Sequence, residues 1–157
     1  MSTSPKLRAI LVGGTIAGAL DILFAITWAA INGRTPAWLL QTVATGLLGE
    51  PAYSGGVPTA ILGLASHFAL SFGWAALFVA VASRLPALVA KPAFTGPAFG
   101  ILVFFAMRLV VLPLSAFPFP VTFSQPGATL DLLSHMFLFG LPIAFAAAKA
   151  LRPGARR

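Results

Sequence analysis

The sequence contains no cysteine and few charged residues. Among its 157 residues are ten Lys or Arg, three Asp or Glu and two His, whereas 59% are apolar. The absence of cysteine excludes a disulfide, a thiolate nucleophile and a cysteine-ligated metal. So few charges cannot cover a soluble globule of this apolar content, and the mean hydropathy of +0.96 is typical of a membrane protein. We therefore predict an all-α membrane protein.

Four apolar stretches are long enough to cross a membrane, which takes about 20 residues as a helix. They cover residues 7–31, 58–82, 93–117 and 129–151. The first stretch is longer than the apolar core of a signal peptide, so we expect it to be retained as a helix. The prediction is a four-helix bundle that forms one transmembrane domain over residues 1–157.

The basic residues predict the orientation. Lys6 and Arg8 precede the first stretch, and Arg84 and Lys91 lie between the second and the third. Four more lie at the end of the fourth stretch or beyond it, whereas the opposite side has only Arg34. The positive-inside rule then places both termini in the cytoplasm, with anionic lipids as partners at that face. The net charge of +7 does not indicate nucleic acid, because the basic residues do not cluster with stackable aromatic side chains.

The first outer loop, residues 32–57, contains a second kind of helix signal. Thr35 can cap a helix and Pro36 suits its first position. Apolar residues then recur at helical spacing up to Gly49, and Trp28 and Trp38 bracket the start, as tryptophans do at a membrane interface. We predict a short interfacial helix here, either as an anchor or as a lid.

Each predicted span contains one titratable residue far from its ends. These residues are Asp21, His67, Arg108 and His135, and counting 1.5 Å per residue from the cytoplasmic charges places them at one level in the outer half of the bilayer. Such groups are costly in lipid, so a polar layer is the best functional clue in the chain. Asp131 lies one helical turn before His135, where it can fix the histidine tautomer or favour the helix N-terminus.

Glycines at four-residue spacing accompany these polar residues. Small residues at this spacing let two helices approach closely, so we expect these faces to point into the bundle. The predicted helix-packing positions are Gly14, Gly18, Gly63, Gly96 and Gly100.

Two prolines interrupt the third and fourth spans near the polar residues. Pro113 and Pro142 each lack the backbone donor that an α-helix needs, and we expect each to kink its helix. The carbonyls freed at a kink can line a cavity.

The motifs of the last two-thirds of the chain resemble one known family. Ser66-His67 with Ser71, Gly96-xxx-Gly100 followed by Pro113-Leu114, and Asp131-xxx-His135 are similar to the pattern of the YagU-type bacterial inner-membrane proteins. Arg108 departs from this pattern, which has a histidine there, and the first loop is shorter. The resemblance implies a small multi-pass protein of the bacterial inner membrane and marks the same positions. It implies no reaction.

Three functions fit these observations. In the first, the chain is a structural or accessory membrane protein in which Asp21 and Arg108 pair to fix the helix register. In the second, the polar residues relay protons or hold a small solute in a transporter, with a homodimer as the expected assembly. In the third, His67 and His135 are axial ligands of a haem. The pattern does not predict an enzyme, a metal site or a resident cofactor.

Overall fold

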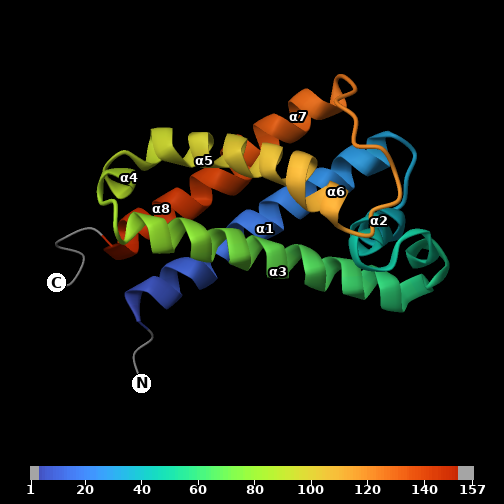
Figure 1. Cartoon of the computed structure of the whole chain (residues 1–157), viewed down its shortest axis with the longest axis horizontal. Helices are drawn as coiled ribbons and strands as arrows, with labels where there is room; N and C mark the ends of the chain where they lie inside the picture. The colour runs from blue at the N-terminus through green and yellow to red at the C-terminus, as the bar shows by residue number, and fades with distance from the viewer. Residues whose placement is uncertain (1–3, 152–157) are drawn as a thin grey trace.

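The computed structural model describes residues 4–151, which form helices joined by turns and one longer loop (Figure 1). Four helical segments are long and apolar enough to cross a membrane: Pro5–Ile31, Gly56–Ala82, Pro92–Leu114 and Gly127–Leu151. The all-helical class and the four apolar helices are thus confirmed. The third segment ends three residues before position 117, because Ser115 is extended and its hydroxyl accepts a hydrogen bond from the Phe117 N–H.

The first two segments are single helices, whereas the last two are each divided by a π-helical stretch. The segments consist of α1 (Pro5–Ile31); α3 (Gly56–Ala82); α5 (Pro92–Ala106), η2 (Met107–Val111) and α6 (Leu112–Leu114); and α7 (Gly127–Ser134), η3 (His135–Gly140) and α8 (Leu141–Leu151). Two further helices, α2 (Pro36–Leu48) and α4 (Ala87–Ala90), lie at opposite ends of the bundle (Figure 1).

The two π-helical stretches have a common cause in the sequence. Each ends two residues before a proline, Pro113 after η2 and Pro142 after η3. A proline cannot donate to the carbonyl four residues earlier, and its ring displaces that carbonyl. The N–H preceding each proline, of Leu112 or of Leu141, instead donates to the carbonyl five residues earlier. The spans therefore widen into a π-turn where the polar residues Arg108 and His135 lie, a feature that is frequent at functional sites.

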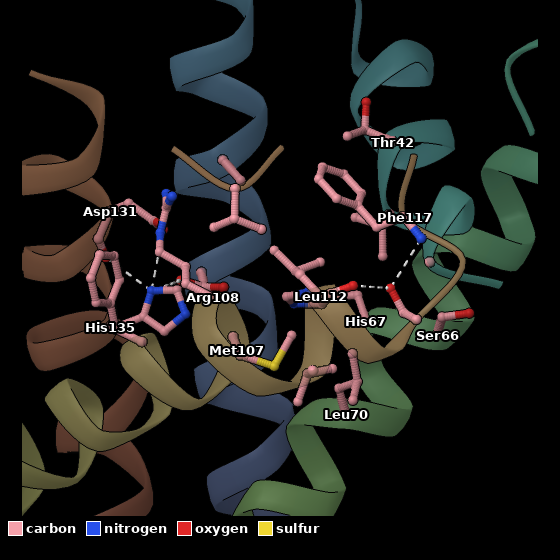
Figure 2. A pocket seen from close by; sticks show the side chains of 18 of the residues that line it. Thr42, Ser66, His67, Leu70, Met107, Arg108, Leu112, Phe117, Asp131 and His135 are labelled. Atoms are coloured by element: carbon pink, nitrogen blue, oxygen red, sulfur yellow. Dashed lines mark hydrogen bonds and ion pairs between the residues drawn. The ribbon is translucent and has the colours of Figure 1, made fainter. Parts of the chain in front are cut away.

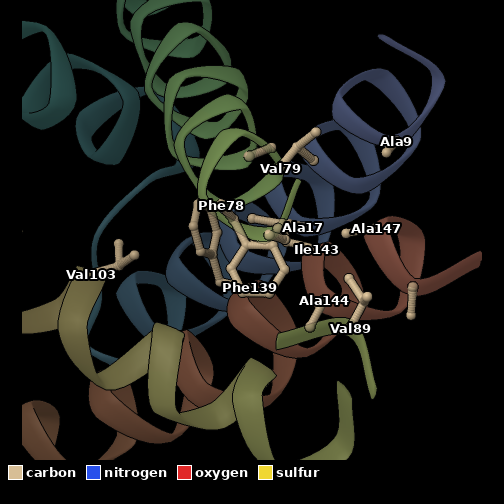
Figure 3. Packing of buried hydrophobic residues seen from close by; sticks show 13 residues of the cluster. Ala9, Ala17, Phe78, Val79, Val89, Val103, Phe139, Ile143, Ala144 and Ala147 are labelled. Atoms are coloured by element: carbon tan, nitrogen blue, oxygen red, sulfur yellow. The ribbon is translucent and has the colours of Figure 1, made fainter. Parts of the chain in front are cut away.

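The apolar core lies toward the α4 end of the bundle (Figure 3). There α1 packs against α3 and α8, and α5 packs against η3 and α8. Phe78, Val103, Phe139 and Ile143 are almost fully buried in this cluster. On the outer surface of the bundle, large apolar side chains are exposed, and Leu23 is more than half exposed. Such exposure is expected of residues that face lipid.

The helix predicted in the first loop is α2, and it packs on α3. The Thr35 hydroxyl caps α2 by accepting a hydrogen bond from the Trp38 N–H, and Pro36 occupies the first position of the helix. The Gln41 side chain donates to the Gly56 carbonyl at 3.1 Å, and Gly63 lies against the backbone of Leu40. A 3-10 turn, η1 (Glu50–Ser54), then leads into α3. Its place at the membrane interface stays a prediction.

Candidate functional site

A cleft of about 1030 Å³ lies between α1, α2, α3, η2 and the loop that follows α6 (Figure 2). Most of its lining is apolar. Its polar side chains are those of Asp21, Thr42, Ser66, His67, Arg108, Ser115, Thr122, Asp131 and His135. The cleft thus includes all five of the titratable residues singled out in the sequence. Its size suits a drug-sized molecule.

Arg108 joins the third span to the fourth and to the loop between them. Its Nη2 lies 2.8 Å from Asp131 Oδ2, and its Nη1 donates to the Thr122 carbonyl at 2.6 Å. The guanidinium carbon also lies 4.9 Å from the ring centre of Phe104 and 5.4 Å from that of Phe123. The charge of Arg108 is therefore balanced by a carboxylate and its position is fixed on several sides.

His135 lies between the two carboxylates. Its Nδ1–H donates to the backbone carbonyl of Asp131 at 2.9 Å, and the same nitrogen lies 3.2 Å from Asp131 Oδ1 and 4.0 Å from Asp21 Oδ1. The i,i+4 spacing thus brings Asp131 and His135 together and fixes the histidine tautomer. His135 also begins η3, where its carbonyl packs against Gly100.

Asp21 has a different partner from the one expected. Its Oδ1 accepts a hydrogen bond from the Ser134 hydroxyl at 2.7 Å, and its side chain is 14% exposed. The expected pair of Asp21 with Arg108 is not formed among residues 4–151, because Asp131 and the loop carbonyl occupy the guanidinium. Within that described range, no hydrogen bond reaches the second carboxylate oxygen, Oδ2, of Asp21.

His67 lines the same cleft but is bonded to another turn of α1. Its Nε2–H donates to the Gly18 carbonyl at 2.9 Å, and one turn further along α3 the Ser71 hydroxyl donates to the Gly14 carbonyl at 2.7 Å. These two bonds hold α3 against α1. In the described part of the chain, no hydrogen bond joins His67 to the other four titratable residues.

The five glycines allow the close helix contacts that position these groups. A side-chain carbon at Gly63 would overlap the carbonyl of Leu40, and one at Gly100 would overlap that of His135. The same atom at Gly96 would lie 2.7 Å from Leu141 Cα. At Gly14 and Gly18 it would collide with Phe72 and Phe68, the aromatic neighbours on α3.

Each histidine retains one nitrogen that has no hydrogen-bond partner among residues 4–151: Nδ1 of His67 and Nε2 of His135. These are the atoms that a haem iron would need as axial ligands. No group of three or more His, Asp or Glu residues in the described chain could hold a metal ion.

Three contributors were not among the candidate site residues. Ser134 binds Asp21, the Thr122 carbonyl binds Arg108, and Trp74 lines the cleft with a buried indole N–H that has no partner in the described chain. The position of Ser134 next to His135 was the only sequence signal for it.

Comparison with family models, curated proteins and solved structures finds no match to this chain. Membership of the YagU-type family therefore stays a prediction.

Proposed function

We propose that this chain is a four-span protein of the bacterial inner membrane that binds a small amphipathic molecule in the cleft. One observation carries the proposal: the cleft combines a few hydrogen-bonding side chains, among them Asp21 and His67, with a much larger apolar surface. Amphipathic ligands are bound in this way, with apolar walls for affinity and a few polar groups for orientation.

Access from the lipid follows from the exposure of the cleft wall. On α3, the lining residues Ala69, Leu70, Gly73 and Leu77 are all exposed. In the membrane these side chains face hydrocarbon, so a molecule dissolved in the bilayer reaches the cleft sideways without crossing the loops. Release of that molecule on the other side would make the protein a transporter, with a homodimer as the expected assembly.

The proposed topology has both termini in the cytoplasm. The start of α1 and the end of α8 lie at the α4 end of the bundle (Figure 1), so Lys6, Arg8, Arg84, Lys91 and Lys149 gather there. A cytoplasmic α4 end satisfies the positive-inside rule and brings these charges to anionic headgroups. The cleft then lies in the outer half of the membrane, with α2 beyond it.

Two matched substitutions on α3 test the binding site. Ala69 and Ala65 are one turn apart and both exposed, but only Ala69 lines the cleft. We expect native mass spectrometry of the detergent-purified chain to detect a co-purified molecule in the wild type and in Ala65→Phe, and to lose it in Ala69→Phe. Identical spectra for the two variants, or no bound molecule in the wild type, would contradict the proposal.

The second candidate function is a structural or accessory one, and the pairing of the polar groups favours it. The contacts of Arg108 with Asp131, of Asp21 with Ser134 and of His67 with Gly18 all join different spans. Buried polar contacts of this kind can fix which helices pack together and in which register. If Ala69→Phe leaves every property of the protein unchanged while substitution of these residues unfolds it, the structural function is the correct one.

A further inference from the structure

We infer that the cleft takes a lipophilic organic cation, with its charge beside Asp21 and its apolar part against Trp74 and Phe117. This inference rests on the proposed function and adds the charge of the ligand to it. The first observation is the balance of charge in the cleft. Its lining contains two carboxylates, Asp21 and Asp131, and a single guanidinium, that of Arg108. The two carboxylates thus outnumber the one guanidinium in the lining.

Asp21 is the carboxylate that has no guanidinium partner. Asp131 is compensated by Arg108 at 2.8 Å, whereas the hydroxyl of Ser134 supplies Asp21 with a hydrogen bond but no charge. His135 lies further from Asp21, at 4.0 Å, than from Asp131, at 3.2 Å. A carboxylate that lines an apolar cleft gains from a cation, because a single charge is costly away from water.

The same contacts argue against an anion. The Arg108 guanidinium donates to Asp131 and to the Thr122 carbonyl, and Phe104 and Phe123 pack against it. His67 lines the cleft from α3. Since its Nε2–H donates to the Gly18 carbonyl, its Nδ1 presents a lone pair, which is an acceptor. Asp21 and His67 thus present acceptors to the cleft, while the donors left without a partner among residues 4–151 include the single N–H groups of Trp74 Nε1 and Arg108 Nε.

The rest of the lining indicates an organic cation rather than a metal ion. The described residues offer no set of three metal ligands, so a small inorganic cation would keep few contacts. Trp74 and Phe117 instead line the cleft as aromatic surfaces, and aromatic faces attract organic cations. Figure 2 shows Phe117 across the cleft from Arg108, on the side of Thr42 and Ser66.

Two ions of the same shape and opposite charge test the inference: tetraphenylphosphonium and tetraphenylborate. Binding of each to the detergent-purified full chain is measured by equilibrium dialysis, and the amount retained by Ala69→Phe is subtracted to remove partitioning into detergent. We expect the phosphonium to bind and the borate to bind at least about tenfold more weakly. Asp21→Asn should weaken the binding of the phosphonium by about tenfold or more and leave the binding of the borate unchanged or make it stronger.

The outcomes separate the inference from the proposed function. Equal binding of the two ions, with no effect of Asp21→Asn, would overturn the cation inference and leave an amphiphile-binding cleft. Binding of neither ion above the Ala69→Phe level would contradict both. The comparison of the two ions uses the wild-type chain, so the inference stays testable even if Asp21→Asn does not fold.

Discussion

Arg108 Nη2 lies 2.8 Å from Asp131 Oδ2, so the π-helical turn of the third span is ion-paired to the first turns of the fourth. The two side chains are 20% and 34% exposed, which places the pair between a buried and a surface salt bridge. Asp131 also contacts His135 at 3.2 Å, so one carboxylate holds two partners.

Loss of this carboxylate should destabilise the bundle. We expect Asp131→Asn to lower the free energy of unfolding by about 1–3 kcal/mol, between the values typical of exposed and of buried pairs. Denaturation of the purified protein in mixed micelles measures the change. The double variant with Arg108→Gln should lose less stability than the sum of the losses in the two single variants. Additive losses of stability would show that the pair contributes nothing.

Gly100→Ala should be strongly destabilising. The new methyl group would overlap the His135 carbonyl. Because that carbonyl belongs to the backbone, the overlap is relieved only if the third and fourth spans move apart. A loss of about 2 kcal/mol or more is expected. Gly73→Ala is the matched control, because its methyl group would meet nothing within 4 Å. Equal melting temperatures of the two variants would contradict the close packing.

Gln41→Ala should loosen α2. The amide of Gln41 donates to the Gly56 carbonyl and is 8% exposed, so its removal takes away a buried contact between α2 and α3 worth about 1 kcal/mol. Hydrogen exchange should become faster over residues 36–48 and stay unchanged in α1. Unchanged exchange in α2 would mean that its apolar contacts alone hold it.

The absence of native cysteine allows a direct test of the topology. Single cysteines at Ser54 and Ser124, which are exposed at the α2 end, should react with an impermeant maleimide in intact cells with an opened outer membrane. A cysteine at Leu85, exposed next to α4, should react only after the inner membrane is permeabilised. The reverse pattern would place the termini outside.

The elements of this fold were readable from the sequence for simple reasons. Apolar length predicts a membrane-crossing helix, and Thr35 with Pro36 predicts the start of α2, where the structure has it. Pro113 and Pro142 predicted disturbed helices, although not that the disturbance would be a π-turn. Local chemistry was sufficient in each of these cases.

The partners within the site were not readable, because they depend on the order of the helices around the bundle. Hydropathy and charge leave that order open, so the pairing of Asp21 with Arg108 was predicted only under the structural hypothesis. In the structure α1 packs on α8 and reaches η3, which brings Ser134 and His135 to Asp21 instead. The loop carbonyl of Thr122 could not be foreseen either, since a backbone acceptor has no signature in the sequence.

The bond between Asp21 and Ser134 has a consequence for how the protein is made. The two residues are 113 positions apart in the chain. At about 5–20 residues per second, a ribosome adds Ser134 roughly 6–23 s after Asp21. Throughout that interval the first span carries its carboxylate without the hydroxyl that later binds it, so the nascent chain has to wait, at the insertion machinery or in the lipid, for its last helix to arrive.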